Sequence, residues 1–435
     1  MPSLSISRCL VALLLVVPAL RAQRADSAAT ARGLMRTAGE QLASGDTAAA
    51  AGSVLAASRA WPRQLAYQVT AARMLVAAGR HAEAVDALGR ANAGGYAWNP
   101  DNPALDPLRA LPGFAELAAT ARASAAPLVR SAVYRALPDA MLHPEGIAHD
   151  SITGRIYVSS VRRAKVVVIE PDGRVRDFVP ASAGLEATFG LAVDRRRGVL
   201  WIATSRTPEQ ARPGTVGHSG AALVAVDLED GREAARWVIA DTSQPHLLGD
   251  LALGPDGTLW ATDSRTPGLY RVEPGSRGGP LEPAPIRSPD WVSLQGVAIA
   301  RSGGEAWVAD WTTGLFHIDL ASGEVHPVAA AVKDVTLGID GLYLVGPRRL
   351  IGIQNGMAPA RVVEVTLDAD GRRVDRLRVL DRHLPLAEEP TLGVVARGAL
   401  LYVANSPWGH YRADGTPDPA RPFPVPTLLR LPLDR

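Results

Sequence analysis

Six copies of a short sequence unit follow one another through the C-terminal two-thirds of the chain, and this repeat limits the fold more than any other feature. Most copies begin with a glycine beside apolar residues and continue through a turn into an aromatic-rich strand. The copies begin at residues 145–148, 189–192, 249–252, 295–298, 340–343 and 392–395. Units of this length with several short strands are typical of propeller blades. We therefore predict a mainly β fold, a six-bladed β-propeller over residues 127–435 with four strands in each blade.

The sixth unit has too few strands to complete a blade. After residues 392–397 and 400–404, only 427–431 has the composition of a strand. Residues 131–137, just before the first unit, alternate in polarity and can supply the missing strand. Pairing them with the last unit would close the ring and leave no unpaired edge. We predict that 131–137 is the outer strand of the last blade.

The N-terminal segment, residues 23–126, is rich in alanine and has apolar residues at helical spacing. The motif that begins at Gly45 recurs at Gly79, an offset of 34 residues. This is the tetratricopeptide period, in which a glycine turn joins two paired helices. We predict a small all-α, tetratricopeptide-like domain. It is either a helical spacer or a groove for a protein partner.

The first 22 residues have the features of a secretory signal peptide. Arg8 precedes an apolar stretch from Cys9 to Val17, and a short segment follows that ends at Ala22. The apolar stretch is too short to cross a bilayer, which favours a cleaved signal over an anchor. We expect an exported protein, periplasmic or extracellular, with no membrane span after cleavage of residues 1–22.

Composition narrows the classes of function. Cleavage would take two of the 46 basic residues, none of the 44 acidic ones, and the only cysteine. The mature chain would then be neutral, which argues against a nucleic-acid partner. Without a thiol it could form no disulfide, zinc–thiolate site or cysteine nucleophile. The sequence also lacks the serine-hydrolase, phosphate-binding and zinc-peptidase motifs.

One face of the predicted ring gathers oxygen-bearing side chains. The first strand of a blade lines the channel and the second runs back beside it, so the start of one and the end of the other share a face. This places at one rim the residues Glu145, Asp250, Gln295, Asp340, Ser159, Asp263, Asp310, Asn355 and Asn405. Such a ring of oxygens suits a hard cation such as calcium.

These residues carry a family resemblance. The chain from about residue 131 to the end resembles the gluconolactonase and senescence-marker family of six-bladed, calcium-binding lactone hydrolases. The match lies in Glu145-Gly146, in Asp250, and in Asp340-Gly341. The resemblance implies that Glu145 and Asp340 are metal ligands and that Asp340 is also the general base. It implies that Gln295 takes the place of the family's fourth-blade asparagine ligand.

Two departures alter the substrate that the resemblance implies. Gly249 stands where the family has an asparagine, and Leu247 where it has the arginine that clamps sugar lactones. We therefore expect apolar lactones or aryl esters rather than a sugar acid lactone. Asp250 and His246 are candidates for substrate binding, although His246 could equally be an ordinary loop histidine. The insertion 206–220 in the second blade is either a partial lid or a long surface loop.

Several prominent residues have structural explanations. The tryptophans that recur at one blade position, and the aspartates at turns and strand ends, are expected to pack or to cap: Trp201, Trp260, Trp307, Asp194, Asp256, Asp263 and Asp310. Glu145 and Asp340 differ, because their position is apolar or small in three of the other units. Two acids at one channel mouth would repel each other unless a cation lay between them.

Two functions remain open from the sequence. The first is an enzyme, a metal-dependent hydrolase of a lactone or other ester, in which a cation polarises the carbonyl and Asp340 activates water. The second is a non-catalytic propeller that binds a ligand or protein in the cell envelope, with the helical repeats extending its surface. The two retained acids, Glu145 and Asp340, favour the enzyme. The loss of the family's asparagine and arginine, replaced by Gly249 and Leu247, favours the binding protein.

Overall fold

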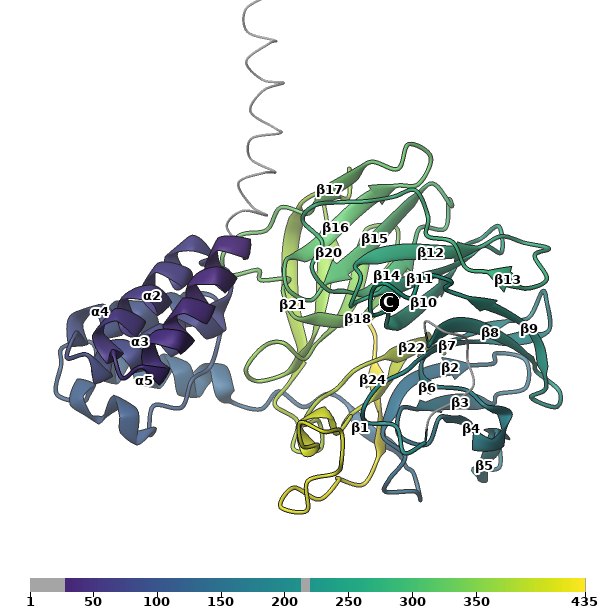
Figure 1. Ribbon diagram of the computed structural model, residues 1–435, viewed down its shortest axis with the longest axis horizontal. Helices are drawn as coiled ribbons and strands as arrows, with labels where there is room; N and C mark the ends of the chain where they lie inside the picture. Colours follow the sequence, from purple (N-terminus) through teal and green to yellow (C-terminus); the bar gives the residue numbers. More distant parts are fainter. Residues whose placement is uncertain (1–27, 213–219, 435) are drawn as a thin grey trace, which may run out of the picture. The chain divides into compact units, whose positions relative to one another are not determined.

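The computed structural model describes residues 28–212 and 220–434, which form two compact units. The first runs up to Ala125 and includes Ser288–Asp290, and the second comprises Ala126–Arg287 and the chain from Trp291 onward. The predicted signal segment lies outside the described residues, as do residues 213–219 of the insertion 206–220. No helix in the described part of the chain is long and apolar enough to span a membrane. The fold is mainly β, a six-bladed propeller preceded by helices, which confirms the predicted class (Figure 1).

The N-terminal unit is entirely helical. Residues 28–43 are helical. They are followed by α2 (Thr47–Ala60), α3 (Leu65–Ala77), α4 (His81–Ala93), a 3₁₀ helix (Pro103–Leu108) and α5 (Phe114–Ala125). Gly45 and Gly79 lie in the turns before α2 and α4 with φ of +84° and +73°, which glycine adopts without steric cost. Alanines fill much of the core between the helices and allow close packing. The assignment of this unit to the tetratricopeptide class stays a prediction.

Six sheets make up the second unit. The first contains β2 (Pro144–His149), β3 (Ile156–Ser160), β4 (Lys165–Ile169) and β5 (Val175–Val179). The second contains β6 (Ala187–Asp194), β7 (Val199–Ser205), β8 (Ala221–Asp227) and β9 (Glu233–Val238). The third contains β10 (Leu248–Leu253), β11 (Leu259–Asp263) and β12 (Gly268–Val272). The fourth contains β14 (Leu294–Ile299), β15 (Glu305–Asp310), β16 (Gly314–Asp319) and β17 (Val325–Pro327). The fifth contains β18 (Ile339–Gly346), β19 (Arg349–Gln354), β20 (Arg361–Leu367) and β21 (Val374–Arg382).

The third blade differs from the expected four strands. After β12 the chain leaves the sheet, and β13 (Gly279–Pro280) instead pairs in parallel with β9 of the second blade. The segment 273–287 holds four prolines, which have no N–H to donate to a ladder. Proline content therefore explains why this blade lacks an outer strand of its own.

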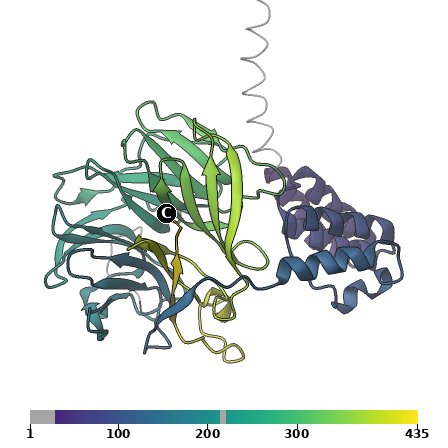
Figure 2. The same cartoon turned by 180° about the vertical axis from the view of Figure 1, so that it is seen from behind.

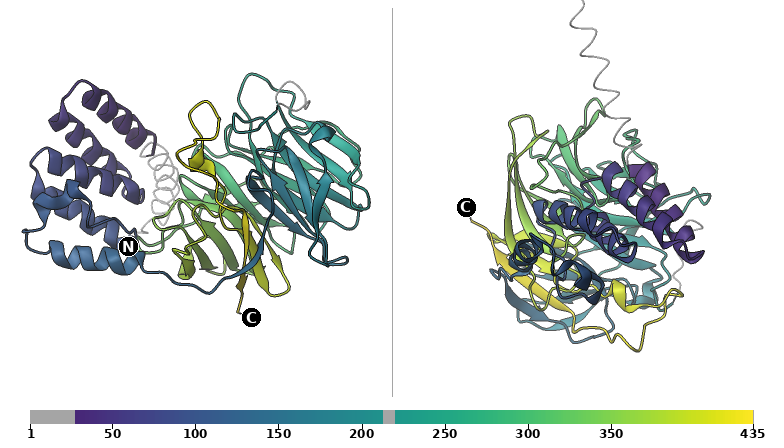
Figure 3. Two further views of the ribbon diagram at one scale, coloured as in Figure 1. Left: turned by 90° about the horizontal axis from the view of Figure 1, so that it is seen from below. Right: turned by 90° about the vertical axis from the view of Figure 1, so that its left-hand side faces the viewer.

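The last blade is completed by the strand that begins the propeller. Its strands are β22 (Gly393–Ala396), β23 (Ala399–Val403), β24 (Thr427–Pro432) and, at the outer edge, β1 (Ala132–Ala136). β1 runs antiparallel to β24, and Figures 2 and 3 show the blue strand beside the yellow one. This is the pairing that the strand count in the sequence predicts. Buried Asp381 holds the segment before β1 by accepting hydrogen bonds from the backbone N–H groups of Arg130 and Ser131.

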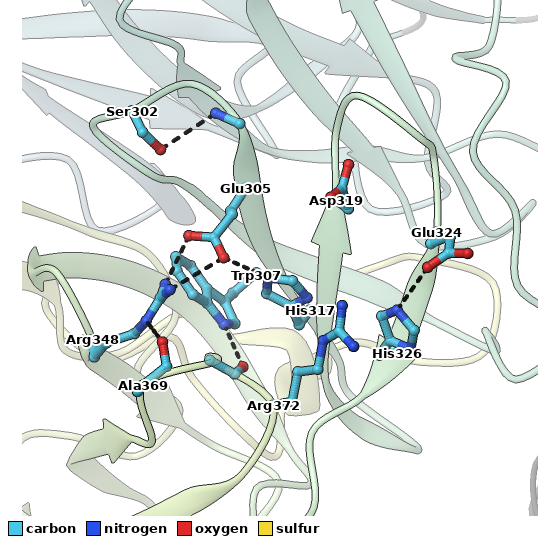
Figure 4. A network of polar contacts seen from close by, with 12 residues as sticks. Ser302, Glu305, Trp307, His317, Asp319, Glu324, His326, Arg348, Ala369 and Arg372 are labelled. Carbon is cyan, nitrogen blue, oxygen red and sulfur yellow. Dashed lines mark hydrogen bonds and ion pairs between the residues drawn. The ribbon is translucent and has the colours of Figure 1, made fainter. Parts of the chain in front are cut away.

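Tryptophans at one strand position pack between blades, as predicted. Trp201, Trp260 and Trp307 lie in three separate clusters that each join neighbouring sheets. At the contact between the fourth and fifth blades, the Trp307 indole donates to the Gly371 carbonyl at 2.9 Å. Arg348 lies over the same ring and pairs with Glu305 at 2.8 Å (Figure 4). Packing and ion pairing together hold these two blades in register.

The pairing of β1 with β24 generates a prediction about truncation. A chain that begins at residue 127 keeps the whole propeller and should fold without the helical unit. One that begins at residue 140 loses β1 and exposes the edge of β24, so it should be poorly soluble and melt at lower temperature. Solubility and thermal unfolding of the two chains test this. Equal melting temperatures would show that β1 does not close the ring.

Candidate functional site

A cavity of about 250 Å³ opens at the centre of the propeller. Five inner strands contribute the residue at one equivalent position to its wall, Glu145, Phe189, Gly249, Gln295 and Asp340, and Leu392, directly before β22, contributes the sixth. The loops around it add Leu247, Ser264, Ser293, Trp311, Asn355, Glu389 and Trp408. The structure therefore brings together the three residues predicted to hold a metal, Glu145, Gln295 and Asp340.

Glu145 is 7% exposed and is held by neutral donors. Its Oε2 accepts hydrogen bonds from the Ser406 hydroxyl at 2.6 Å and the Trp408 indole N–H at 3.1 Å. Both donors come from the long loop between β23 and β24. Burial raises the pKa of Glu145 well above its usual range, and the charge of Asp340 raises it further. The carboxyl is therefore fixed in position but costly to ionise.

Asp340 is fixed by a similar chain of neutral donors. Its Oδ2 accepts from the Asn355 side-chain amide at 2.7 Å, and the Asn355 oxygen accepts from the Trp311 indole at 2.9 Å. Burial raises the pKa of Asp340 to about 7, although the bond from Asn355 opposes the shift. A carboxyl with such a pKa can exchange protons near neutral pH, as a general base must.

Gln295 and Gly249 complement each other. The Gln295 Oε1 lies 3.6 Å from the point where a Cβ on Gly249 would stand. The Gln295 amide oxygen thus lies in contact with the position that a third-blade side chain would take. Gln295 therefore keeps an amide oxygen at this side of the cavity although Gly249 has no side chain.

Two of the predicted residues lie elsewhere. The Asp250 carboxylate binds the backbone N–H groups of Leu251 at 2.8 Å and Val297 at 3.4 Å, which joins the third and fourth blades behind the cavity wall. Burial raises the pKa of Asp250 to about 7. His246 lines a separate cavity, with Nδ1 against Asp263. Neither residue is among those that line the central cavity.

The aspartates expected to be structural have that role. Asp310 accepts four backbone N–H groups, those of Val292, Ser293, Thr312 and Thr313. Asp263 binds the backbone N–H groups of Leu247, Arg265 and Thr266. Both close turns at the ends of second strands, which confirms their assignment as caps.

Glu389 is a third cavity carboxyl that sequence reasoning missed. It lies in the loop before β22, outside any repeat position. The only signal in the sequence was that the residue is acidic, which does not distinguish it from a surface glutamate. Burial raises its pKa to about 7, and the charge of Asp340 adds to this effect. Trp311 and Trp408 were also missed, because they lie in loops whose course the repeat does not define.

No lining residue of this cavity, among those the structure describes, is basic. Three carboxyls therefore face one another without a cationic side chain in the wall. Across the described ranges, no group of three or more His, Cys, Asp or Glu side chains could hold a metal ion by itself. A cation here would depend on two carboxylates, the amide of Gln295, and water.

Comparisons with known proteins give structural neighbours only. No family model and no curated protein matches the chain. A gluconolactonase from Xanthomonas campestris is 18% identical, covers 67% of this chain and 86% of its own, and has a TM-score of 0.45. Regucalcin from Agrobacterium tumefaciens, a calcium-binding protein, is 15% identical, with 70% and 98% covered and a TM-score of 0.46. Virginiamycin B lyase from Staphylococcus aureus is 13% identical, with 69% and 98% covered and a TM-score of 0.43. The neighbours include the gluconolactonase type that the sequence resembles.

The raised pKa values generate a prediction about stability and pH. Asp250, Asp340 and Glu389 bind protons in the native state up to about pH 7, whereas unfolded carboxyls release theirs near pH 4. The native state therefore holds more protons between these values, and stability falls as pH rises. Each such group contributes at most about 1.4 kcal/mol per pH unit.

Thermal unfolding in chelator between about pH 5 and 7 checks this. Buried His143, whose pKa is lowered to about 3, acts in the opposite direction over this range, but it is one group against three carboxyls. The Asp250→Asn, Glu389→Gln double variant should show a flatter dependence. A melting temperature that rises with pH in the native chain would contradict the assignment.

Proposed function

We propose that the protein is a hydrolase that cleaves a lactone or other ester in the central cavity. Asp340 is the general base, and Glu145, Gln295 and Asp340 hold a divalent cation, calcium. The observation that supports this most is the pair of buried carboxylates, Glu145 and Asp340, on a wall without a basic residue. Their mutual repulsion is costly unless a proton or a cation lies between them.

The donor set fits a hard cation. Oε2 of Glu145 accepts from two neutral donors and Oδ2 of Asp340 from one, and no described residue hydrogen bonds to Oε1 of Glu145 or Oδ1 of Asp340. The amide oxygen of Gln295 adds a third oxygen at the same wall. Calcium accepts carboxylate, amide and water oxygens, typically six to eight in all. These three residues would supply part of that shell.

The protein's own groups perform the proton transfers. A bound cation would supply polarisation of the ester carbonyl. Asp340 takes a proton from water at Oδ1, and its Oδ2, which is fixed by the bond from Asn355, keeps a second lone pair with which it would hold the cation. The water oxygen bonds to the carbonyl carbon, the bond to the alcohol oxygen breaks, and Asp340 returns the proton to that oxygen. Water is consumed, and an acid and an alcohol are formed.

The walls favour a substrate with an apolar body. Phe189, Leu247, Trp311, Leu392 and Trp408 line the cavity beside the acids. The Trp311 side chain remains partly exposed, which leaves a ring face for stacking. Leu247 offers no hydrogen bond to a sugar hydroxyl. We therefore propose aryl esters or apolar lactones as the substrate class.

The setting of this activity is also a proposal. The secretory features of residues 1–22 support an exported, periplasmic or extracellular enzyme. The helical unit supports a protein partner, which would bind through its repeats. Detection of the chain in periplasmic or culture fractions, cleaved near residue 22, tests the first point.

Calcium should stabilise the protein. A ligand that binds only the native state adds about 2.7 kcal/mol at a free concentration about 100 times its dissociation constant. Thermal unfolding with calcium and with chelator measures the shift, which Asp340→Asn and Glu145→Gln should reduce. In chelator the same variants should be neutral or stabilising, because they relieve the repulsion between the two carboxyls. Identical melting temperatures for the native protein under both conditions would rule out the site.

Aryl esters should be cleaved faster than gluconolactone. Asp340→Asn keeps the shape of the side chain but loses the base, so kcat should fall by roughly 100-fold or more. Leu247→Arg, which places a cationic donor at the wall, should shift preference toward the sugar lactone. Initial rates with p-nitrophenyl acetate and gluconolactone measure both effects. Saturable gluconolactone hydrolysis in the native protein that disappears in Asp340→Asn would disprove the apolar assignment.

A further inference from the structure

Glu389 brings a third carboxyl to the central cavity, beside the two that are proposed to hold calcium. Its backbone carbonyl accepts from the Ser406 N–H at 2.9 Å, which ties the loop before β22 to the loop between β23 and β24. Burial raises the pKa of Glu145, and the charges of Asp340 and Glu389 add to this effect. Burial and the charge of Asp340 likewise raise the pKa of Glu389. The Glu389 carboxyl therefore lies near both of the other acids, on the cavity side of its loop.

No cationic side chain offsets this third charge. The neighbouring residue, Glu388, is the one that pairs with His410 at 3.2 Å and with Arg421 at 3.6 Å. Among the described residues Glu389 itself forms no ion pair, and its carboxyl accepts from a neutral donor, the backbone N–H of Gly409. The charge of His410 lowers the pKa of Glu389, yet burial and the nearby acids outweigh it. The described lining of the cavity includes no basic residue that could do more.

A single calcium ion would leave Glu389 without a partner of opposite charge. Glu145 and Asp340 are 7% and 9% exposed, and each keeps one carboxylate oxygen to which no described residue hydrogen bonds, as a cation site requires. In the described parts of the chain no three acidic or histidine side chains could hold one ion together, so Glu389 is not a third ligand. Calcium would offset the two carboxylates that bind it, and the charge of Glu389 would remain.

Aromatic side chains share the cavity with this remaining charge. Trp311 and Trp408 both line it, and Trp311 is 37% exposed. Trp408 stacks on Phe189, another lining residue, with ring centroids 6.3 Å apart and an angle of 14° between the planes. Aromatic rings attract organic cations as well as apolar groups. A wall of aromatic rings and one unpaired carboxylate therefore suits a group that is both apolar and positively charged.

We propose that the substrate is an ester or lactone that carries a positively charged amine. This inference rests on the proposed hydrolysis in the same cavity and narrows its substrate class. The ester group lies at Asp340, the charge of the amine is offset by Glu389, and the apolar body contacts Trp311 and Trp408. A neutral ester fits the same walls but leaves the carboxylate of Glu389 unpaired.

Two esters of one shape test the contribution of charge. 3-(Trimethylammonio)phenyl acetate and 3-tert-butylphenyl acetate differ in that a carbon replaces the charged nitrogen. Rates are measured with calcium at about pH 8, above the pKa of Glu389, which is about 7. The ratio of kcat/KM for the charged ester to that for the neutral one should fall roughly tenfold in Glu389→Gln, because the variant loses the charge that attracts the amine. A ratio that Glu389→Gln leaves unchanged would overturn the inference.

Glu388→Gln is the matched control. It removes the same charge one residue away, from a side chain that does not line the cavity. This variant should keep the ratio of the native protein. An equal fall in both variants would show a general effect of net charge and would refute a contact between the amine and Glu389.

A binding measurement separates this inference from the proposed hydrolysis. Isothermal titration of the full-length protein with calcium present should show binding of phenyltrimethylammonium and roughly tenfold weaker binding of neutral benzyl alcohol. Glu389→Gln should weaken the binding of phenyltrimethylammonium, and Glu388→Gln should not. If neither ester is cleaved, the proposed hydrolysis fails, and this titration alone decides whether the cavity holds an amine. Equal binding of the two probes, or no binding of phenyltrimethylammonium at millimolar concentration, would disprove the amine site.

Discussion

The close approach of neighbouring inner strands at the centre of the ring is the constraint on which the site depends. A Cβ on Gly190 would lie 2.5 Å from the Gly249 carbonyl oxygen, and one on Gly296 would lie 2.5 Å from that of Asp340. Side chains at these positions would force the blades apart. The residue just before such a glycine supplies the cavity wall, so Glu145, Gln295 and Asp340 converge because Gly146, Gly296 and Gly341 let their strands meet.

The repeat therefore made both the fold and the central residues predictable. In five of the six units a glycine beside apolar residues marks the inner strand, and the residue before it marks the wall; in the third unit Asp250 takes the place of that glycine. Glu389, Ser406 and Trp408 lie in loops between repeat positions, where no period indicates which way the chain turns. The strand β13 was also unpredictable, because a two-residue parallel pair leaves no pattern in the sequence.

His246, for which the sequence left substrate binding and an ordinary loop position open, does not line the central cavity. It directly precedes Leu247, which does, yet it lines the separate cavity beside the third blade. Asp263 explains this division, since one carboxylate oxygen accepts from the Leu247 backbone while the other holds the His246 ring. The same aspartate thus fixes a wall of each cavity.

The pairing of β1 with β24 also bears on how the chain reaches its native state. The two strands lie at opposite ends of the propeller sequence, so their contact is among those of greatest sequence separation in the molecule. Contacts of this kind form late, because the loop they close is long and its entropy is lost before the pairing is gained. During synthesis the first five blades can assemble, but β1 has no partner until the residues of β24 have been made. The helical unit, attached directly before β1, would meanwhile be tethered to an unpaired strand, which makes this interval the stage at which the nascent protein most needs protection from aggregation.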